Sequence, residues 1–308
     1  GAIGETIRSL LNDWQIHFSR RVGLAARRTF RLLTANSTNA KALAPRSRTE
    51  AVVMVETGVE PPATVQQRDF HHGGPLRLLW SGVFEHRKAL HLLLEALAKL
   101  PANVPYELRI LGRGPLENRW RKIARRLNVD QHCHWLGWLV HPQAIEQYQW
   151  ADALVFSSLR DTTGNVVLEA FAAGTPVLCL DHQGMADIVT PQCGVKLPVT
   201  TPHDVVLGLR DTLVRWHANP DELARLSRGA VERADHYSWT RQGERMADLY
   251  RQMCESKATA ADLVRDNRMA GSEDFADAAI GNRRGERRIA EDESAAESLA
   301  AGAASIGS

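Results

Sequence analysis

The chain has 308 residues, 44% of them hydrophobic, and a formal net charge of +2 at pH 7. It can bury the core of a full domain with further parts beside it, which excludes a small protein held together by disulfides or metal. Its four scattered cysteines form no Cys-x-x-Cys pair, so the sequence predicts neither a zinc ribbon nor a disulfide framework and favours a reducing cytoplasm.

Residues 1–33 are predicted to be helical, because apolar side chains recur on one face before several arginines. Residues 1–50 hold nine Lys and Arg against three Asp and Glu. Such a basic surface is either solvated or in contact with anionic lipid at the inner face of a membrane. A strand at 51–56 and a turn at 58–62 follow, and residues 61–75 have the polar composition of a linker.

From residue 76 onward, predicted strands alternate with predicted helices. Strands are expected at 76–82, 106–112, 132–137, 153–156 and 177–180. Helices are expected near 88–100, 116–127, 143–150, 165–173 and 185–188, with three closing helices near 202–218, 220–236 and 239–255. Repeated strand–helix units with continuously apolar strands predict an α/β fold with a parallel, Rossmann-like doubly wound sheet over residues 76–255.

After about residue 256 the composition shifts to Ala, Ser, Gly, Glu and Arg, with almost no large apolar side chains. Too little burial is available there to offset the entropy of ordering, so we expect residues 256–308 to be a disordered tail. No apolar run in the sequence reaches the roughly 20 residues that cross a bilayer, and the start lacks the pattern of a secretory signal. The sequence therefore predicts a soluble or peripheral protein.

Two carboxylates, Asp161 and Glu169, lie eight positions apart across a predicted strand-to-helix junction. Glu169 is a lone carboxylate in an apolar helix segment, and burying it without partners is costly, so we expect a polar group to meet it. The helix begins at Gly164 and Asn165, just beyond a strand end, where free N–H groups favour an anion. The alternative is that Asp161 or Thr162 caps the helix and Glu169 lies on its solvated face.

The first strand of the domain ends at Gly82, and the loop after it leads to Arg87 and Lys88 at a predicted helix start. Two cations there oppose the helix dipole by about 0.3–1 kcal/mol each. That cost disappears if a phosphate lies between the cations and the backbone N–H groups. The alternative is a pair of exposed side chains in water.

The next strand ends in Gly112 and Gly114, like the beginning of a dinucleotide-binding fingerprint, but Glu117 stands where its third glycine should be. Nicotinamide binding is therefore not predicted. Two glycines still let a ligand approach the backbone closely. After the third strand, Trp138 is either a face for a base or sugar or a packing residue.

The remaining chemistry-bearing residues do not predict a metal or nucleic-acid site. On a strand, His132 and His134 point the same way and Cys133 the other, so the three share no tetrahedral shell. A second basic cluster spans residues 113–126, but no aromatic residues are interleaved in a basic stripe, so nucleic-acid binding is not expected.

Together these motifs resemble the C-terminal, nucleotide-sugar-binding domain of family 4 retaining glycosyltransferases of the GT-B fold. The resemblance runs from about Leu76 to Met253 and rests on the loop from Gly82 to Lys88, LGRGP, WLGWL, ADALVFSS, the carboxylate pair, AAGTPVL, the Gly184 loop and the closing Ser238-Trp239 helix. It implies that residues 1–60 are the remnant of a preceding acceptor-binding domain. A chain of this kind is expected to bind donor without transferring sugar by itself.

The resemblance also implies an activity: transfer of a sugar from a nucleoside diphosphate sugar to a glycan or lipid-linked acceptor, with retained configuration and without a cofactor or an essential metal. Lys88 and Asp161 are the implied catalytic residues, contacting the donor diphosphate and the transferred sugar, and Glu169 is implied to hold the ribose hydroxyls. Backbone N–H groups of Asn165 and Val166 are implied to meet the phosphate or sugar. The rest of the implied donor site is Gly82, Arg87, Gly112, Gly114, Gly137, Trp138, Leu139 and Gly164.

Two positions depart from the family pattern. Asp161 stands where glutamate is usual, and Val83 stands where an arginine commonly follows the loop glycine, which leaves Arg87 to compensate at the diphosphate. Two alternatives share the fold. One is a nucleotide-sugar-binding module without transfer activity, which would keep Glu169 and Lys88, and the other is a GT-B epimerase or phosphorylase.

Overall fold

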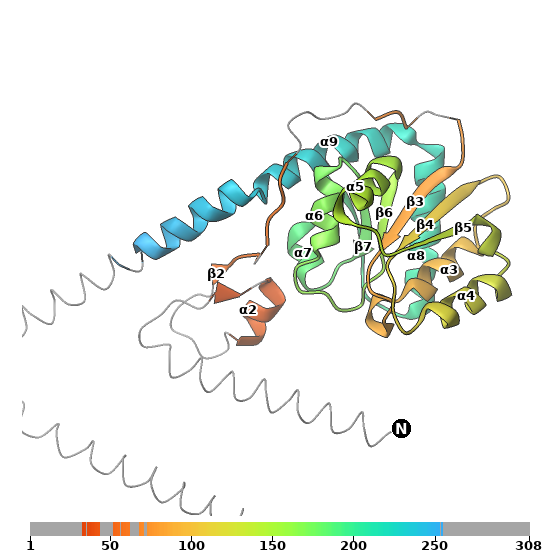
Figure 1. Cartoon of the computed structure of the whole chain (residues 1–308), viewed down its shortest axis with the longest axis horizontal. Helices are drawn as coiled ribbons and strands as arrows, with labels where there is room; N and C mark the ends of the chain where they lie inside the picture. The colour runs from red at the N-terminus through yellow and green to blue at the C-terminus, as the bar shows by residue number, and fades with distance from the viewer. Residues whose placement is uncertain are drawn as a thin grey trace, which may run out of the picture. The chain divides into compact units, whose positions relative to one another are not determined.

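Figure 1 shows a computed structural model of the chain. It describes residues 33–34, 36–43, 52–55, 57–61, 68–70, 73–252 and 254. The chain divides into two compact units after residue 248, and the fold described below belongs to the first. Apart from Leu33, which lies in a short strand, the helix predicted over residues 1–33 lies outside the described residues, as does the predicted tail at 256–308.

Six strands form a parallel sheet in the order β5-β4-β3-β6-β7-β8. They are β3 (Leu76–Ser81), β4 (Tyr106–Leu111), β5 (Cys133–Gly137), β6 (Ala153–Phe156), β7 (Val177–Leu180) and β8 (Gly194–Leu197). The chain runs outward from β3 to β5, returns to β6 beside β3, and then runs outward to β8. The strand order therefore reverses between β3 and β6, and open α/β sheets bind ligands beyond the carboxyl ends of the strands at such a reversal.

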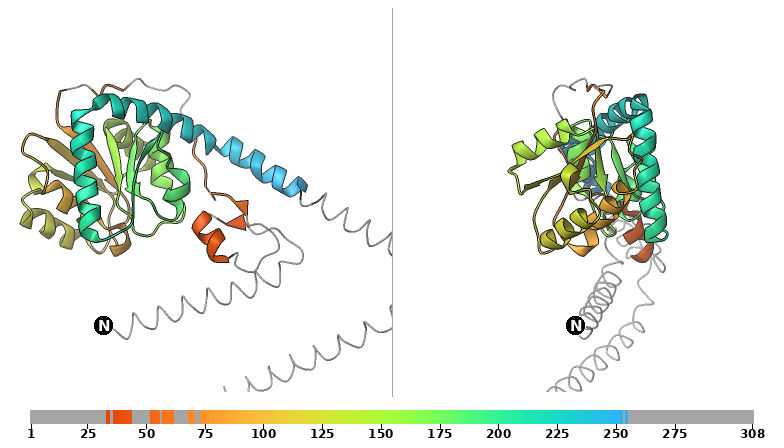
Figure 2. Two further views of the ribbon diagram at one scale, coloured as in Figure 1. Left: turned by 180° about the vertical axis from the view of Figure 1, so that it is seen from behind. Right: turned by 90° about the vertical axis from the view of Figure 1, so that its right-hand side faces the viewer.

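Helices cover both faces of this sheet (Figure 2). They are the 3-10 turn η1 (His86–Lys88), α3 (Leu90–Leu97), α4 (Glu117–Arg126), α5 (His141–Trp150), α6 (Asn165–Ala172), α7 (Gly184–Ile188), α8 (Pro202–Ala218) and α9 (Pro220–His236). A further helix runs over residues 239–252, and none of these residues belongs to either core. One core contains α3, α4 and α8, the opposite core contains α5, α6 and α7, and α9 contributes to both. The predicted doubly wound α/β fold is confirmed.

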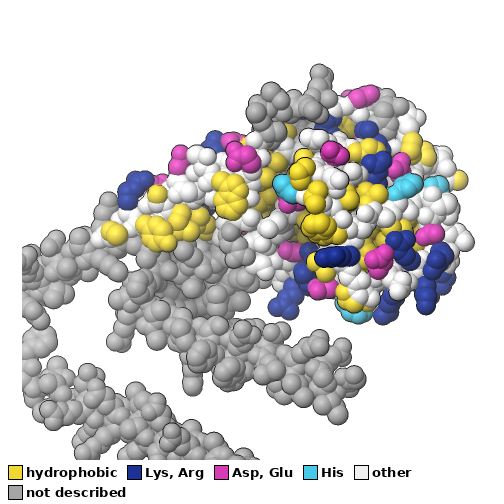
Figure 3. Space-filling model, in the orientation of Figure 1, with side chains coloured by type: hydrophobic (Ala, Val, Ile, Leu, Met, Phe, Trp, Pro, Cys, Tyr) yellow, Lys and Arg dark blue, Asp and Glu magenta, His cyan; other side chains and the backbone are white. Residues whose placement is uncertain are grey.

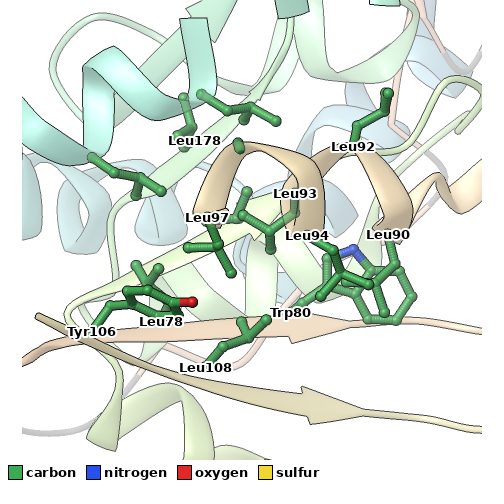
Figure 4. Packing of buried hydrophobic residues seen from close by; sticks show 14 of the residues in the cluster. Leu78, Trp80, Leu90, Leu92, Leu93, Leu94, Leu97, Tyr106, Leu108 and Leu178 are labelled. Carbon is green, nitrogen blue, oxygen red and sulfur yellow. The ribbon is translucent and has the colours of Figure 1, made fainter. Parts of the chain in front are cut away.

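β3 shows why the central strands of the sheet are mainly apolar. Leu78 and Trp80 belong to the core under α3, Leu79 belongs to the core on the other face, and none of the three is more than 1% exposed. Successive side chains of a strand point to opposite faces, so a strand buried on both cannot alternate with polar residues. Figure 4 shows leucines of α3, among them Leu93, lying over Leu78 and Trp80 and over Leu108 of the neighbouring strand.

The short elements before the domain form a second, two-stranded parallel sheet. β1 (Leu33–Thr34) pairs with β2 (Val52–Val53), and α2 (Ser37–Leu43) lies between them in the sequence. The strand predicted at 51–56 is thus present over its middle. The turn predicted at 58–62 is not found in its described part, where Val59 instead forms a parallel bridge with Ser238.

Residues 68–70, which the sequence analysis places in the linker, pack into the domain. Phe70 is 7% exposed and belongs to the core under α3. The Arg68 guanidinium donates to Thr175 Oγ1 at 2.6 Å and to the carbonyl of Ala173 at 3.0 Å. The polar composition of this segment led us to expect an exposed linker. An arginine can nevertheless be buried where oxygen acceptors receive its N–H groups.

Gly112 generates a prediction about stability. Its φ is +123°, and a Cβ there would lie 1.9 Å from the carbonyl oxygen of Gly82. Because neither backbone can move aside, Gly112→Ala should lower the free energy of unfolding by about 2 kcal/mol or more in chemical denaturation. The control is Gly243→Ala in the helix over 239–252, where a Cβ meets nothing within 4 Å. It should be neutral or slightly stabilising, and equal effects of the two substitutions would contradict the prediction.

Candidate functional site

The carboxyl ends of β3, β4 and β5 meet through glycines. The Gly82 N–H donates to the carbonyl of Leu111 at 3.1 Å, and the Gly112 N–H donates to the carbonyl of Gly137 at 2.7 Å. Hydrogen bonding of the sheet therefore continues beyond the strands. With no side chains in the way, three adjacent strand ends present backbone groups at one edge of the sheet.

A cavity of about 940 Å³ lies at these strand ends. Of the donor residues implied by the sequence, those that line it are Gly82, Gly112, Gly114, Trp138, Leu139 and Glu169. Its volume falls within the range of roughly 300–1,000 Å³ typical of small-molecule sites. Val83, Arg113, Glu117, His141 and Tyr148 also line it and were not assigned to the site from the sequence.

Glu169, on α6, has the polar partner expected from its apolar surroundings. The Tyr148 hydroxyl donates to Glu169 Oε2 at 2.9 Å, and His141 Nδ1 lies 3.9 Å from Oε1. The Glu169 side chain is 27% exposed and lines the cavity. It therefore faces a bordered cavity rather than the open, solvated helix face of the alternative.

Tyr148 and His141 were missed, although α5 places them on one face. With Ala144 they have the spacing i, i+3, i+7, which aligns side chains along a helix, and all three line the cavity. Tyr148 is 1% exposed, and burial together with the charge of Glu169 raises its pKa well above the ordinary value. Its hydroxyl therefore remains a hydrogen-bond donor. Ser81 Oγ lies 3.3 Å from the same phenolic oxygen.

Lys88 and Asp161 meet where the strand order reverses. Lys88 Nζ pairs with Asp161 Oδ2, and the two side chains are 10% and 15% exposed. Arg87 Nη1 lies 3.7 Å from the same oxygen, and Asp161 Oδ1 accepts the Gly164 N–H at 3.2 Å. Asp161 thus holds the start of α6, as the capping alternative expects, and also contacts two cations.

Lys88 lies in the turn η1 rather than in the first turn of α3 as predicted. Ala89, left-handed at φ 47°, separates η1 from α3. The charge of Lys88 is therefore compensated by the carboxylate of Asp161, and Lys88 does not lie in the first turn of α3, where it would oppose the helix dipole. The lysine Cδ lies 3.6 Å from where a Cβ on Gly82 would be, so its stem runs beside a cavity-lining residue. The Ser157 hydroxyl donates to the Lys88 carbonyl at 2.9 Å and ties η1 to the end of β6.

The residues assigned from the sequence thus fall into two neighbouring groups. The first lines the cavity. The second does not line it and comprises Arg87, Lys88, Gly137, Asp161, Gly164, Asn165 and Val166. In this group Gly164 is the left-handed N-cap of α6 at φ 60°, and Asn165 begins the helix.

Among the described residues, no three His, Cys, Asp or Glu side chains gather as a metal site requires. The expectation that His132 and His134 share a strand is wrong. His132 lies in the 3-10 turn η2 (Asp130–His132), and only His134 lies in β5, where its Nε2 is 3.6 Å from Glu107.

The fold of this chain aligns with solved structures that are described in complex with UDP. The structure of Anabaena HepE in complex with UDP aligns with a TM-score of 0.61 at 16% identity, over 76% of this chain and 68% of that one. The pneumococcal O-GlcNAc transferase GtfA in complex with UDP and GlcNAc aligns with a TM-score of 0.60 at 13% identity, over 72% of this chain and 45% of that one. At these identities the likeness concerns the fold.

The chain belongs to the family of group 1 glycosyl transferases, whose model matches residues 64–230. It is 30% identical over 180 residues to the glycogen synthase of Mycobacterium tuberculosis, across 58% of this chain and 42% of that protein. It is also 30% identical over 185 residues to the D-inositol 3-phosphate glycosyltransferase of Streptomyces bingchenggensis, across 56% of this chain and 39% of that protein. The resemblance found in the sequence is confirmed, and the chain spans less than half the length of these relatives.

The buried phenol of Tyr148 predicts a loss of stability in alkali. An unfolded tyrosine titrates near pH 10, and folding raises the pKa of Tyr148 well above that. The contribution of the neutral Tyr148 phenol to the unfolding free energy is therefore fully present below about pH 10 and is lost as the pH rises further. Between pH 8 and about pH 10.5, the parent should lose more unfolding free energy than Tyr148→Phe, by on the order of 1 kcal/mol, measured by urea denaturation. Between about pH 7 and pH 8 the difference in unfolding free energy between the two proteins should stay constant. If both proteins lose the same unfolding free energy up to pH 10.5, the raised pKa of Tyr148 is refuted.

Proposed function

We propose that this chain binds a nucleoside diphosphate sugar at the carboxyl edge of its sheet, as the donor-binding part of a retaining glycosyltransferase that transfers the sugar to a glycan or lipid-linked acceptor. One observation carries the proposal: bare glycine strand ends and the Tyr148–Glu169 pair border a single cavity of about 940 Å³. Membership of the group 1 family supports it. So do the fold neighbours HepE and GtfA, which are described in complex with UDP.

Glu169 is proposed to hold the ribose. A carboxylate accepts hydrogen bonds from adjacent hydroxyls, and the Tyr148 hydroxyl fixes one carboxylate oxygen while the other remains available. Trp138, 62% exposed, offers a ring face for the base at the edge of the cavity. The Arg113 guanidinium lies 5.8 Å from the centre of that ring.

Lys88 is proposed to meet the diphosphate. An ammonium group has three donors, so Lys88 can contact a phosphate oxygen while it stays paired with Asp161. Val83 lines the cavity where the family commonly has an arginine. Two guanidiniums are placed to replace that charge: Arg113 also lines the cavity, and Arg87 lies 3.7 Å from Asp161.

Breaking the bond between the anomeric carbon and the diphosphate leaves negative charge on the departing phosphate. The Lys88 ammonium and the first N–H groups of α6, at Asn165 and Val166, are fixed before the reaction and stabilise this charge without reorganising. In this proposal the step needs no metal ion. Asp161 accepts a hydrogen bond from the transferred sugar, and its bonds to Lys88 and Gly164 hold it in place.

No helix in the described part of the chain is long and apolar enough to cross a membrane. Figure 3 shows Lys and Arg side chains gathered over α4. Arg119, Lys122, Arg125 and Arg126 are exposed there, and no ion pair joins them to another described residue. We place the protein in the cytoplasm, with this basic surface suited to anionic headgroups at the inner face of a membrane.

A transfer assay tests whether this chain only binds donor, transfers its sugar or isomerises it. The chain is incubated with nucleotide sugars and with glycan or lipid acceptors, and products are identified by mass spectrometry. Transfer couples loss of donor to a glycosylated acceptor, whereas an epimerase returns an isomerised sugar. From this chain, which spans under half the length of its relatives, we expect donor binding without turnover, since transfer also requires an acceptor held in reacting geometry.

Glu169→Gln should weaken nucleoside diphosphate binding about ten- to a hundredfold, because a hydrogen bond to a charged group contributes roughly 1.5–3 kcal/mol. Calorimetry with UDP, ADP and GDP measures the change for the ligand that the parent binds most tightly. Glu146→Gln, on an exposed residue of α5 that does not line the cavity, should bind like the parent. A Glu169→Gln protein with undiminished affinity would remove the ribose role.

Lys88→Ala should weaken binding of the same nucleoside diphosphate about tenfold or more while changing binding of the bare nucleoside little, because only the diphosphate meets the ammonium. Lys99→Ala, on an exposed lysine beyond α3, is the control for loss of one positive charge. Equal losses for nucleoside and nucleoside diphosphate would show that Lys88 acts on folding and not on the diphosphate.

A further inference from the structure

Arg68 lies before the first strand of the domain and does not line the cavity. Its guanidinium donates to the carbonyl of Ala173, the residue directly after α6, at 3.0 Å. It also donates to the carbonyls of Ala151, the residue directly after α5, and of Tyr148, the latter at 3.5 Å. One side chain therefore joins the C-terminal ends of two helices.

The chemistry of arginine suits this position. The last carbonyls of a helix have no partners within the helix and carry partial negative charge. A guanidinium offers five N–H donors in a rigid fork, so one group can serve carbonyls of two helices at once. Burial lowers the pKa of Arg68 to about 10, against the opposing effect of Asp152. The group therefore carries its charge at neutral pH.

Thr175 completes the link between the helices. Its hydroxyl oxygen accepts from Arg68 Nη1 at 2.6 Å, and the same hydroxyl donates to the carbonyl of Tyr148 at 2.6 Å. Thr175 is fully buried and follows α6 by three residues. The carbonyl of Tyr148 is thus held from two directions.

Tyr148 connects this clamp to the cavity. Its carbonyl is held by Arg68 and Thr175, and its hydroxyl donates to Glu169 at 2.9 Å. A shift of the end of α5 against α6 moves the phenol relative to the carboxylate. The hydrogen bond that orients Glu169 therefore depends on contacts made outside the cavity.

We propose that Arg68 is a positioning residue for the donor site: by clamping the C-terminal ends of α5 and α6, it fixes the Tyr148–Glu169 pair and so the affinity for the nucleoside diphosphate. The proposal rests on the proposed function, because donor binding is its readout. A purely structural Arg68 would also stabilise the domain, since its guanidinium lies 5.3 Å from the ring centre of the buried Phe70. Affinity and stability must therefore be measured separately.

The test uses the full chain and whichever of UDP, ADP and GDP the parent binds most tightly. Arg68→Lys keeps the charge but loses the fork, and Thr175→Val removes the bridging hydroxyl at nearly constant volume. Each should weaken binding about three- to tenfold in calorimetry, and Arg68→Lys in a Glu169→Gln background should add less than about twofold, because coupled residues are not additive. Leu213→Ala, in the core on the other face of the sheet, controls for lost stability without lost affinity.

The outcomes separate the two proposals. Weakened binding that vanishes in the Glu169→Gln background supports the clamp. If Glu169→Gln weakens binding but Arg68→Lys and Thr175→Val change only the thermal midpoint, as Leu213→Ala does, the clamp is refuted and the proposed function stands. If the parent binds none of the three nucleotides, both proposals are refuted.

Discussion

Burial of the sheet on both faces is the constraint on which the rest of this structure depends. Because helices cover both faces, the strand positions that lie in the two cores are apolar, as at Leu78, Leu79 and Trp80. Most of the polar groups that can meet a ligand therefore come from the residues that follow the strands. At the carboxyl end the reversal between β3 and β6 separates the loops that follow these strands, and the cavity lies beside that reversal.

The two ends of the sheet use an aspartate and a cation differently. At the amino end Asp152, 1% exposed, receives two nitrogens of Arg77 on Oδ1, at 2.6 and 3.1 Å, and the Arg77 backbone N–H on Oδ2 at 2.8 Å. That pair is saturated within the fold. At the carboxyl end Lys88 meets Asp161 through a single ammonium contact, so two of its donors stay available. The first arrangement suits a fixed structural pair and the second suits a pair that also meets a ligand.

The sequence was enough to predict the elements whose signal is local, as with the apolar run of β6 and the glycines that end β3 and β4. It also anticipated the partner of Glu169, because an isolated carboxylate among apolar residues requires one. It missed β8, whose GVKL is short and half polar, and Arg68, whose contacts are made 80 to 107 positions away. The i, i+7 spacing of His141 and Tyr148 was readable, but only the assembled fold shows that this face of α5 borders a cavity.

The carboxylates of the site favour one orientation of the proposed donor over the other. A diphosphate is repelled by uncompensated carboxylates, and two of the three at the site are paired with cations: Glu117 with Arg121 at 2.9 Å, and Asp161 with Lys88. Glu169 accepts instead from the neutral hydroxyl of Tyr148, with His141 Nδ1 3.9 Å from its other oxygen, and no Lys or Arg of the described residues pairs with it. A donor bound with its uncharged ribose at Glu169 and its diphosphate toward Lys88 matches this field, whereas the reversed orientation places like charges together. In this proposed arrangement the contacts of Arg68 act through Tyr148 on the ribose end of the donor, and the Lys88–Asp161 pair lies at its diphosphate end.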